Sequence, residues 1–211
     1  MRVSIVDHPL LAATMTTIRD RDTDSPSFTS AVSRAATLLL ATATKELPTL
    51  AGPVDTPLRT TDGTYLAHDP VLVPVLRAGL GMLAAATDLL PRSPIALVGL
   101  RRDERTARAS WYLEALPSDL GGAPVLVLEP MIATGGTLGD VVARLSSHRS
   151  GPATIVSLIC APEGLAALEA ATDDLPIDVH VVAAALDAGL DESHFIVPGL
   201  GDAGDRLFGI S

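Results

Sequence analysis

The chain has 211 residues, of which 47% are hydrophobic and 19% are charged, and its formal net charge is −10. This composition supplies enough apolar side chains for a core and argues against intrinsic disorder. The length predicts one compact domain over residues 1–211. The acidic balance argues against a general nucleic-acid or anionic-membrane binder, because both need a dominant basic surface. We therefore expect no DNA and no membrane partner, and any anion site must be local.

The N-terminus and the single cysteine predict a cytoplasmic protein. Cys160 lies in an apolar run, which favours a buried thiol on a strand, and one cysteine cannot form a disulfide within the chain. Polar residues interrupt the first apolar residues too early for a signal peptide. No stretch reaches the roughly 18 uninterrupted apolar residues that a membrane span needs.

Residues 8–24 and 26–47 carry apolar side chains at helical spacing and predict a leading helical hairpin or arm. Residues 48–70 contain several prolines and glycines and predict loops with short extended pieces. A polar excursion occupies residues 101–119. The rest alternates apolar strands, at 71–76, 95–100, 125–128, 154–161 and 179–185, with helices at 80–90, 139–147 and 163–171.

This alternation predicts an α/β fold whose parallel sheet is covered by helices on both faces. In such a fold, ligands bind beyond the carboxyl ends of the strands. Four unusual segments of this chain follow predicted strands, so we expect them to lie near one another at that edge of the sheet.

The segment at 129–137, EPMIATGGT, joins a strand to a helix. Its small residues let the backbone approach an anion, the free N–H groups of the helix start point toward it, and Thr134 and Thr137 add hydroxyl groups. The spacing matches neither the P-loop nor G-x-G-x-x-G. The Glu129 carboxylate would repel a bare phosphate but accept hydrogen bonds from hydroxyl groups, so a sugar phosphate fits better. An ordinary strand-to-helix turn is the alternative.

Two segments that contain arginine follow other strands. Arg77 ends an apolar strand and indicates a phosphate or carboxylate partner, although a structural salt bridge would explain it equally well. Residues 101–108 contain four arginines and predict a local diphosphate site. A solvated β-arm, neutralised in part by Asp103 and Glu104, is the alternative.

The C-terminal segment 195–209 mixes four glycines with apolar side chains. This mixture predicts an ordered, tightly turned loop rather than a disordered tail. Its exposed backbone can offer both N–H and C=O groups, which suits a planar heterocycle with alternating donors and acceptors.

Together these segments resemble the uracil phosphoribosyltransferase family, which has the type I phosphoribosyltransferase fold. The resemblance runs from Asp7 to the C-terminus and is carried by VPVLRAGLGM (73–82), EPMIATGGT (129–137), APEGLAALE (161–169) and FIVPGLGDAGDRLFG (195–209). It implies a type I phosphoribosyltransferase-like parallel sheet flanked by helices, with an N-terminal helical arm, a β-arm and a C-terminal base-binding loop. The implied reaction transfers the 5-phosphoribosyl group from phosphoribosyl diphosphate (PRPP) to N1 of uracil, giving UMP and diphosphate.

The resemblance also implies the site residues. Arg102, Glu129 and Asp202 would be catalytic, and uracil would lie against Ile196 and the backbone of Gly201, Asp202 and Ala203. Mg²⁺ would be held mainly by PRPP and water, with no protein metal site. The family usually has Asp where this chain has Glu129, which is one methylene longer. PRPP would bind to Arg77, Arg102, Glu129, Pro130, Met131, Ile132, Ala133, Thr134, Gly135, Gly136, Thr137 and Asp202.

The resemblance further implies a homodimer or a higher homo-oligomer, with GTP as an effector in some members. Two alternative functions stay open. One is a divergent paralogue that acts on another base, and the other is a non-catalytic regulator that binds PRPP or a nucleotide. Retention of Arg77, Arg102, the 129–137 loop and Asp202 favours catalysis. Glu129 and an arm that departs from the family, with Arg101 where Tyr is usual, and Ala109 and Ala115 where Pro and Lys are common, would suit a regulator.

Overall fold

A mostly parallel sheet forms the centre of the computed structural model, which describes residues 1–102 and 109–209 but not the side chains of Arg102 and Ala109. The strand order is β1-β10-β9-β7-β4-β5-β6, with the short β8 beside β9. Only β5 and β6 pair antiparallel within it. The strands are β1 (Arg2–Ile5), β4 (Val71–Leu76), β5 (Leu97–Arg102), β6 (Ala109–Ala115), β7 (Val125–Leu128), β8 (Met131–Ile132), β9 (Ala153–Cys160) and β10 (Val179–Leu186). The predicted α/β fold is confirmed.

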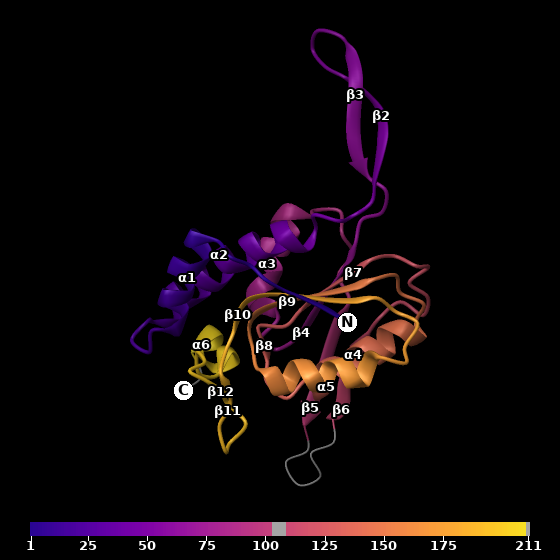
Figure 1. Ribbon diagram of the computed structural model, residues 1–211. Helices are drawn as coiled ribbons and strands as arrows, with labels where there is room; N and C mark the ends of the chain where they lie inside the picture. The colour runs from indigo at the N-terminus through magenta and orange to yellow at the C-terminus, as the bar shows by residue number, and fades with distance from the viewer. Residues whose placement is uncertain (103–108, 210–211) are drawn as a thin grey trace.

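Helices cover both faces of this sheet (Figure 1). One face carries α1 (Pro9–Arg19), α2 (Ser25–Ala43) and α3 (Leu80–Leu89), and the other carries α4 (Gly136–Ser147) and α5 (Pro162–Thr172). The short α6 (Ala203–Phe208) packs beside α2. The two predicted N-terminal helices are present, and they lie against the sheet. No helix in the described ranges is long and apolar enough to cross a membrane.

Alternation along the strands divides the core into two clusters. In β7, Leu126 and Leu128 pack toward α1 to α3, while Val125 and Val127 pack toward α4 and α5. Successive strand side chains point to opposite faces, so a strand covered on both sides must be apolar throughout. The continuous apolar runs in the sequence reflect this double burial.

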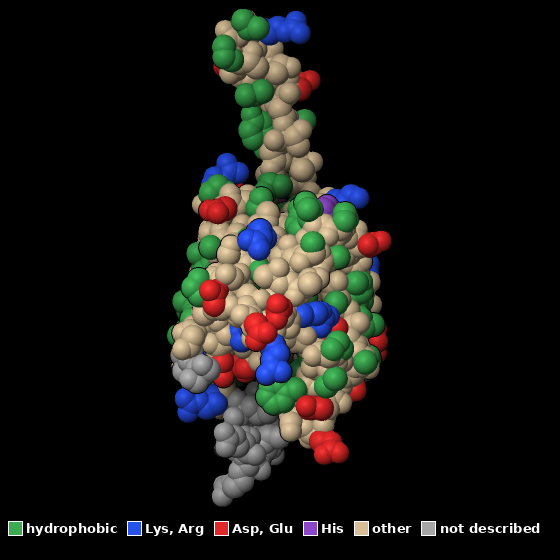
Figure 2. All heavy atoms as spheres, turned by 90° about the vertical axis from the view of Figure 1, so that its left-hand side faces the viewer, with side chains coloured by type: hydrophobic (Ala, Val, Ile, Leu, Met, Phe, Trp, Pro, Cys, Tyr) green, Lys and Arg blue, Asp and Glu red, His purple; other side chains and the backbone are tan. Residues whose placement is uncertain are grey.

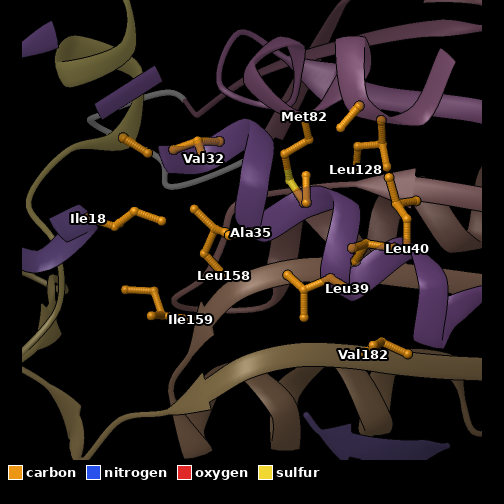
Figure 3. Close-up of a cluster of buried hydrophobic side chains, with 14 of the residues drawn as sticks. Ile18, Val32, Ala35, Leu39, Leu40, Met82, Leu128, Leu158, Ile159 and Val182 are labelled. Atoms are coloured by element: carbon orange, nitrogen blue, oxygen red, sulfur yellow. The ribbon is translucent and has the colours of Figure 1, made fainter. Parts of the chain in front are cut away.

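The helix α2 lies across one face of the sheet and fills the first cluster. Asp24 begins it by accepting the backbone N–H of Ser27 at 2.8 Å, a standard N-terminal cap. Figure 3 shows Leu39 and Leu40 of this helix close to Val182 and other side chains of the sheet. The buried apolar stripe of α2 therefore holds the helix on the sheet.

Three parts of the fold differ from expectation. The segment predicted as loops forms a hairpin of β2 (Thr49–Asp55) and β3 (Thr60–Leu66), which projects from the body (Figures 1 and 2). Both of its faces are largely exposed, so no apolar alternation marks its strands. The edge strand β1 is also short and mostly exposed, and it gave no strand signal. In addition, α4 begins at Gly136, three residues earlier than predicted.

The α2 packing predicts a large cost for Leu39→Ala, because the Leu39 side chain is fully buried between helix and sheet. The free energy of unfolding should fall by about 3 kcal/mol in urea denaturation. Leu58→Ala is the matched control, since Leu58 is 95% exposed, and it should change that free energy by less than about 0.5 kcal/mol. Equal effects of the two substitutions would contradict this assignment of the core.

Candidate functional site

The candidate site lies at the carboxyl ends of β4 and β7, the two neighbouring strands where the chain direction across the sheet reverses. After β4 the chain goes to β5 on one side, and after β7 it goes to β9 on the other. Helices leave such a point on opposite faces and open a crevice beyond the strand ends. The carboxyl end of β5 lies at the same edge, because β4 and β5 are parallel.

Gly79 brings the segment after β4 against the end of β7. A Cβ atom at this position would lie 2.3 Å from the carbonyl oxygen of Leu128, so only glycine fits without a shift of the backbone. Arg77 lies two residues earlier with a 59% exposed side chain. Its guanidinium is 3.7 Å from the Asp205 carboxylate, and this pair links the β4 end to the C-terminal segment. An exposed pair of this kind contributes little stability and leaves the arginine accessible to an anion.

The 129–137 segment divides into a buried support and an accessible turn. Pro130 and Ile132 are buried, and their carbonyl oxygens accept backbone N–H groups of β9 and the residue after it. The turn is accessible in part, with Gly136 exposed and Thr134 and Thr137 half-buried. The nine predicted residues are therefore adjacent, but only some of their side chains can face a ligand.

Gly135 shapes this turn and begins α4. Its φ of +74° is a left-handed conformation, and a Cβ atom there would lie 2.2 Å from the carbonyl oxygen of Gly164 in α5. No side chain caps the N-terminus of α4. The first N–H groups of a helix have no partner within the helix, and the dipole makes that end attractive to anions. This geometry would allow the start of α4 to bind an anion, and we call this turn the anion cradle.

Glu129 sits between β7 and the turn. It is half-buried, and its backbone N–H donates to the Val156 carbonyl oxygen at 3.1 Å. Burial of the carboxyl group raises the pKa of Glu129 to about 8, although the backbone N–H of Met131 acts in the opposite direction. A neutral carboxyl can donate as well as accept a hydrogen bond, so this group can meet ligand hydroxyl groups in either role.

The C-terminal segment closes the site from the side of α6. Ile196 is buried in β12 (Ile196–Val197), which pairs with β11 (Gly189–Leu190). Gly201 and Asp202 are exposed, and Asp202 caps α6 by accepting the Asp205 N–H at 2.9 Å. Ala203 is fully buried, backbone included, so Gly201 and Asp202 are the exposed residues among these three.

Most of the predicted site residues therefore lie at one edge of the sheet. Arg102 ends β5 at this edge, but its side chain lies outside the described residues, as do Arg105 and Arg108 of the arginine cluster. Among the described residues, no group of three His, Cys, Asp or Glu side chains could hold a metal ion. The arrangement offers anion donors and hydroxyl acceptors, which suits a sugar phosphate.

Asp205 is a site residue that we did not predict. Within a glycine-rich segment it resembles any surface acid, and only the fold brings it to Arg77. A cavity of about 690 Å³ lies elsewhere, at the amino edge of the sheet, where Arg2, Glu46 and His180 are part of its lining. None of the predicted site residues lines it.

Comparison with known proteins points to one family. A family model described as uracil phosphoribosyltransferase matches residues 5–210. The chain is 46% identical over 211 residues to a uracil phosphoribosyltransferase of Kineococcus radiotolerans, with all of both chains covered. It is 44% identical over 210 residues to that of Streptomyces griseus, with 99% of each chain covered.

Two solved structures show the similarity of fold. A protein of Aquifex aeolicus is 32% identical, with 99% of each chain covered and a TM-score of 0.92. An adenine phosphoribosyltransferase of Trypanosoma brucei, solved with AMP, pyrophosphate and ribose-5-phosphate, has a TM-score of 0.54. The match covers 91% of this chain and 87% of that chain at 10% sequence identity, so the similarity shows only a common fold.

The turn geometry predicts that Gly135→Ala destabilises the protein through both backbone strain and the contact with Gly164. The free energy of unfolding in urea should fall by about 2 kcal/mol or more. Gly121→Ala is the matched control, because Gly121 has a φ of +59° with nothing within 4 Å of the added Cβ. It should cost only about 1 kcal/mol. A cost for Gly135→Ala no larger than that of the control would show that the contact with α5 is unimportant.

The raised pKa of Glu129 predicts how stability depends on pH. The folded state retains the carboxyl proton up to about pH 8, whereas the unfolded chain releases it near 4.5. This contribution to stability is therefore complete below pH 4.5 and is lost as the pH rises to 8. Urea denaturation across that range should show wild type losing stability relative to Glu129→Gln. A constant difference between the two proteins would mean that Glu129 titrates normally.

Proposed function

The chain belongs to the uracil phosphoribosyltransferase family, and we propose that it transfers the 5-phosphoribosyl group of PRPP to N1 of uracil, forming UMP and diphosphate. One observation carries this proposal: the pair of Arg77 and Asp205 joins the C-terminal segment to the sheet edge at which α4 begins. A sugar phosphate and a base must lie side by side for the transfer, and this edge offers a place for each.

PRPP would bind along the crevice between β4 and β7. The N-terminus of α4, with Thr134, Gly136 and Thr137, suits the 5-phosphate, because its backbone N–H groups lack helical partners. Glu129 would hold the ribose hydroxyl groups, and Arg77 and Arg102 would meet the diphosphate. The Asp202 carboxylate is exposed and would contact PRPP from the other side.

Mg²⁺ fits this site as an ion that arrives with PRPP. The described residues hold no cluster of carboxylates that could enclose a metal, and Mg²⁺ typically keeps water and substrate phosphate oxygens as ligands. When bound, it would neutralise part of the charge that grows on the departing diphosphate. Glu129 would accept a hydrogen bond from a water molecule of that ion.

The transfer needs positioning more than a nucleophilic side chain. The bond between ribose C1′ and the diphosphate oxygen breaks, the bond between C1′ and uracil N1 forms, and the N1 proton leaves to solvent. Positive charge develops on the ribose in an oxocarbenium-like transition state. Arg102 would stabilise the leaving diphosphate, and the loops on both sides would hold the two reactants in line.

Uracil would lie against Ile196 and the backbone of Gly201, Asp202 and Ala203. Backbone N–H and C=O groups there can pair with uracil O2, N3–H and O4. Cytosine presents the opposite pattern at positions 3 and 4, so it would leave buried polar groups unpaired and be rejected.

Other family expectations stay predictions. These are one phosphoribosyltransferase domain over residues 1–211, assembly into a homodimer or a higher homo-oligomer, GTP as an effector, and a cytoplasmic location. The two core clusters on opposite faces of one sheet support the first of them.

The direct test is formation of UMP by the purified protein from uracil, PRPP and Mg²⁺. Wild type should form UMP with uracil and no product with cytosine, and omission of Mg²⁺ should abolish turnover. Arg102→Ala should lower kcat about a hundredfold through loss of leaving-group stabilisation. Arg101→Ala is the matched control, because Arg101 is the adjacent arginine of β5 with an exposed side chain, and it should retain activity.

The outcomes separate the candidate functions. A folded wild type that binds PRPP but forms no UMP would contradict the proposal and favour a regulator. Turnover with a different base and none with uracil would favour a divergent paralogue. An Arg102→Ala variant as active as Arg101→Ala would show that Arg102 does not take part in the reaction.

A further inference from the structure

A partly buried ion pair joins the end of α1 to the residue that follows β10. Asp187 is only 8% exposed, and both of its carboxylate oxygens accept hydrogen bonds from the Arg19 guanidinium, at 2.5 and 2.9 Å. Burial alone would raise the pKa of Asp187, but the hydrogen bonds from Arg19 and Gly199 outweigh it and hold the pKa below its ordinary value. The carboxylate is therefore charged at neutral pH.

This ion pair also forms hydrogen bonds with the backbone of Gly199. The Gly199 N–H donates to Asp187 at 2.9 Å, and its carbonyl oxygen accepts from Arg19 at 2.7 Å. Gly199 has a φ of +67°, and a Cβ atom there would lie 2.1 Å from the Ile196 carbonyl oxygen. Both polar groups of this turn residue are thus fixed by one ion pair.

A second arginine holds the next residue to the same end of α1. Arg206 of α6 donates to the Leu200 carbonyl oxygen at 2.8 Å and to those of Ile18 and Asp20 at 2.6 Å. Its guanidinium also lies over the Phe28 ring at 4.2 Å. The end of α1 is therefore joined to residue 199 by Arg19 and to residue 200 by Arg206. These two residues lie in the chain between Ile196 and the 201–203 backbone.

Stability is a weak reason for a charge pair at this place. Burying two charges costs desolvation free energy that their attraction barely offsets, and an apolar pair could hold the helix as well. An apolar pair could not satisfy both the N–H and the C=O of Gly199. The charged pair therefore sets the position of the loop.

We propose that Arg19 and Asp187 are positioning residues for the base: they touch neither substrate, but they hold residues 196–202 where the loop backbone can pair with uracil. This inference rests on the proposed function, because it deepens the assignment of that loop to the base. It predicts that the pair governs uracil and leaves PRPP, which binds mainly at α4 and the β4 end, largely unaffected.

The test compares steady-state and binding constants of Asp187→Asn and Arg19→Lys with wild type. Asn keeps the volume of Asp187 but loses its charge, and Lys keeps the charge of Arg19 but loses the fork that reaches two acceptors. Each variant should raise KM for uracil about tenfold. The Kd for PRPP, measured by calorimetry without uracil, should change by less than about threefold, because Asp202 is the one residue of this loop that would contact PRPP. The double variant should raise KM no further than either single variant, because both act through one unit.

Arg2→Ala is the matched control, since it breaks an exposed pair with Glu46 (3.0 Å) near the amino edge of the sheet. It should change neither the KM for uracil nor the Kd for PRPP. Thermal unfolding of each variant checks that the protein is folded.

Folded Asp187→Asn with an unchanged KM for uracil would overturn the inference, and so would equal losses for uracil and PRPP. A wild type that forms no UMP would contradict the proposed function instead. In that case, amide hydrogen exchange tests whether the pair of Arg19 and Asp187 holds residues 196–202. Faster exchange of these residues in Asp187→Asn supports the inference, and unchanged exchange overturns it.

Discussion

The close approach of Gly79 to the end of β7 is the contact on which the site depends. A Cβ atom at that position would lie 2.3 Å from the Leu128 carbonyl oxygen, so any larger residue would separate the two strand ends. These are the neighbouring ends from which the chain turns in opposite directions. Arg77 and Glu129 flank this contact along the chain, and the crevice between them exists because the backbone is so close here.

The two sides of this crevice offer different kinds of binding group. The α4 side offers the N–H groups of a helix start, which have no partner within the helix and suit phosphate. The C-terminal side offers the backbone of a tight loop, which suits a planar base. Arg77 brings a positive charge to this edge, within a chain of net charge −10. Figure 2 shows acidic and basic side chains interspersed over the face that bears α1 and α6, so anion affinity comes from particular groups rather than from the whole surface.

The sequence predicted most accurately the strands that are buried on both faces of the sheet. The strands β4 and β7 were predicted to the residue, because double burial requires an unbroken apolar run. The hairpin of β2 and β3 was missed, because exposure on both faces leaves no periodic signal. Most site segments could be predicted from their place after strands. The pair of Arg19 and Asp187 could not, because 168 positions separate its members and neither lies in a recognisable motif.

The central claim is that one edge of the sheet holds both halves of a nucleotide. Amide hydrogen exchange with and without UMP tests it most directly, because UMP carries the phosphoribosyl group and the base together. The account predicts that UMP slows exchange in residues 129–138 and in residues 196–205 at once, while residues 172–180 at the opposite edge are unaffected. Protection of only one of the two segments, or protection of residues 172–180 in their place, would contradict it.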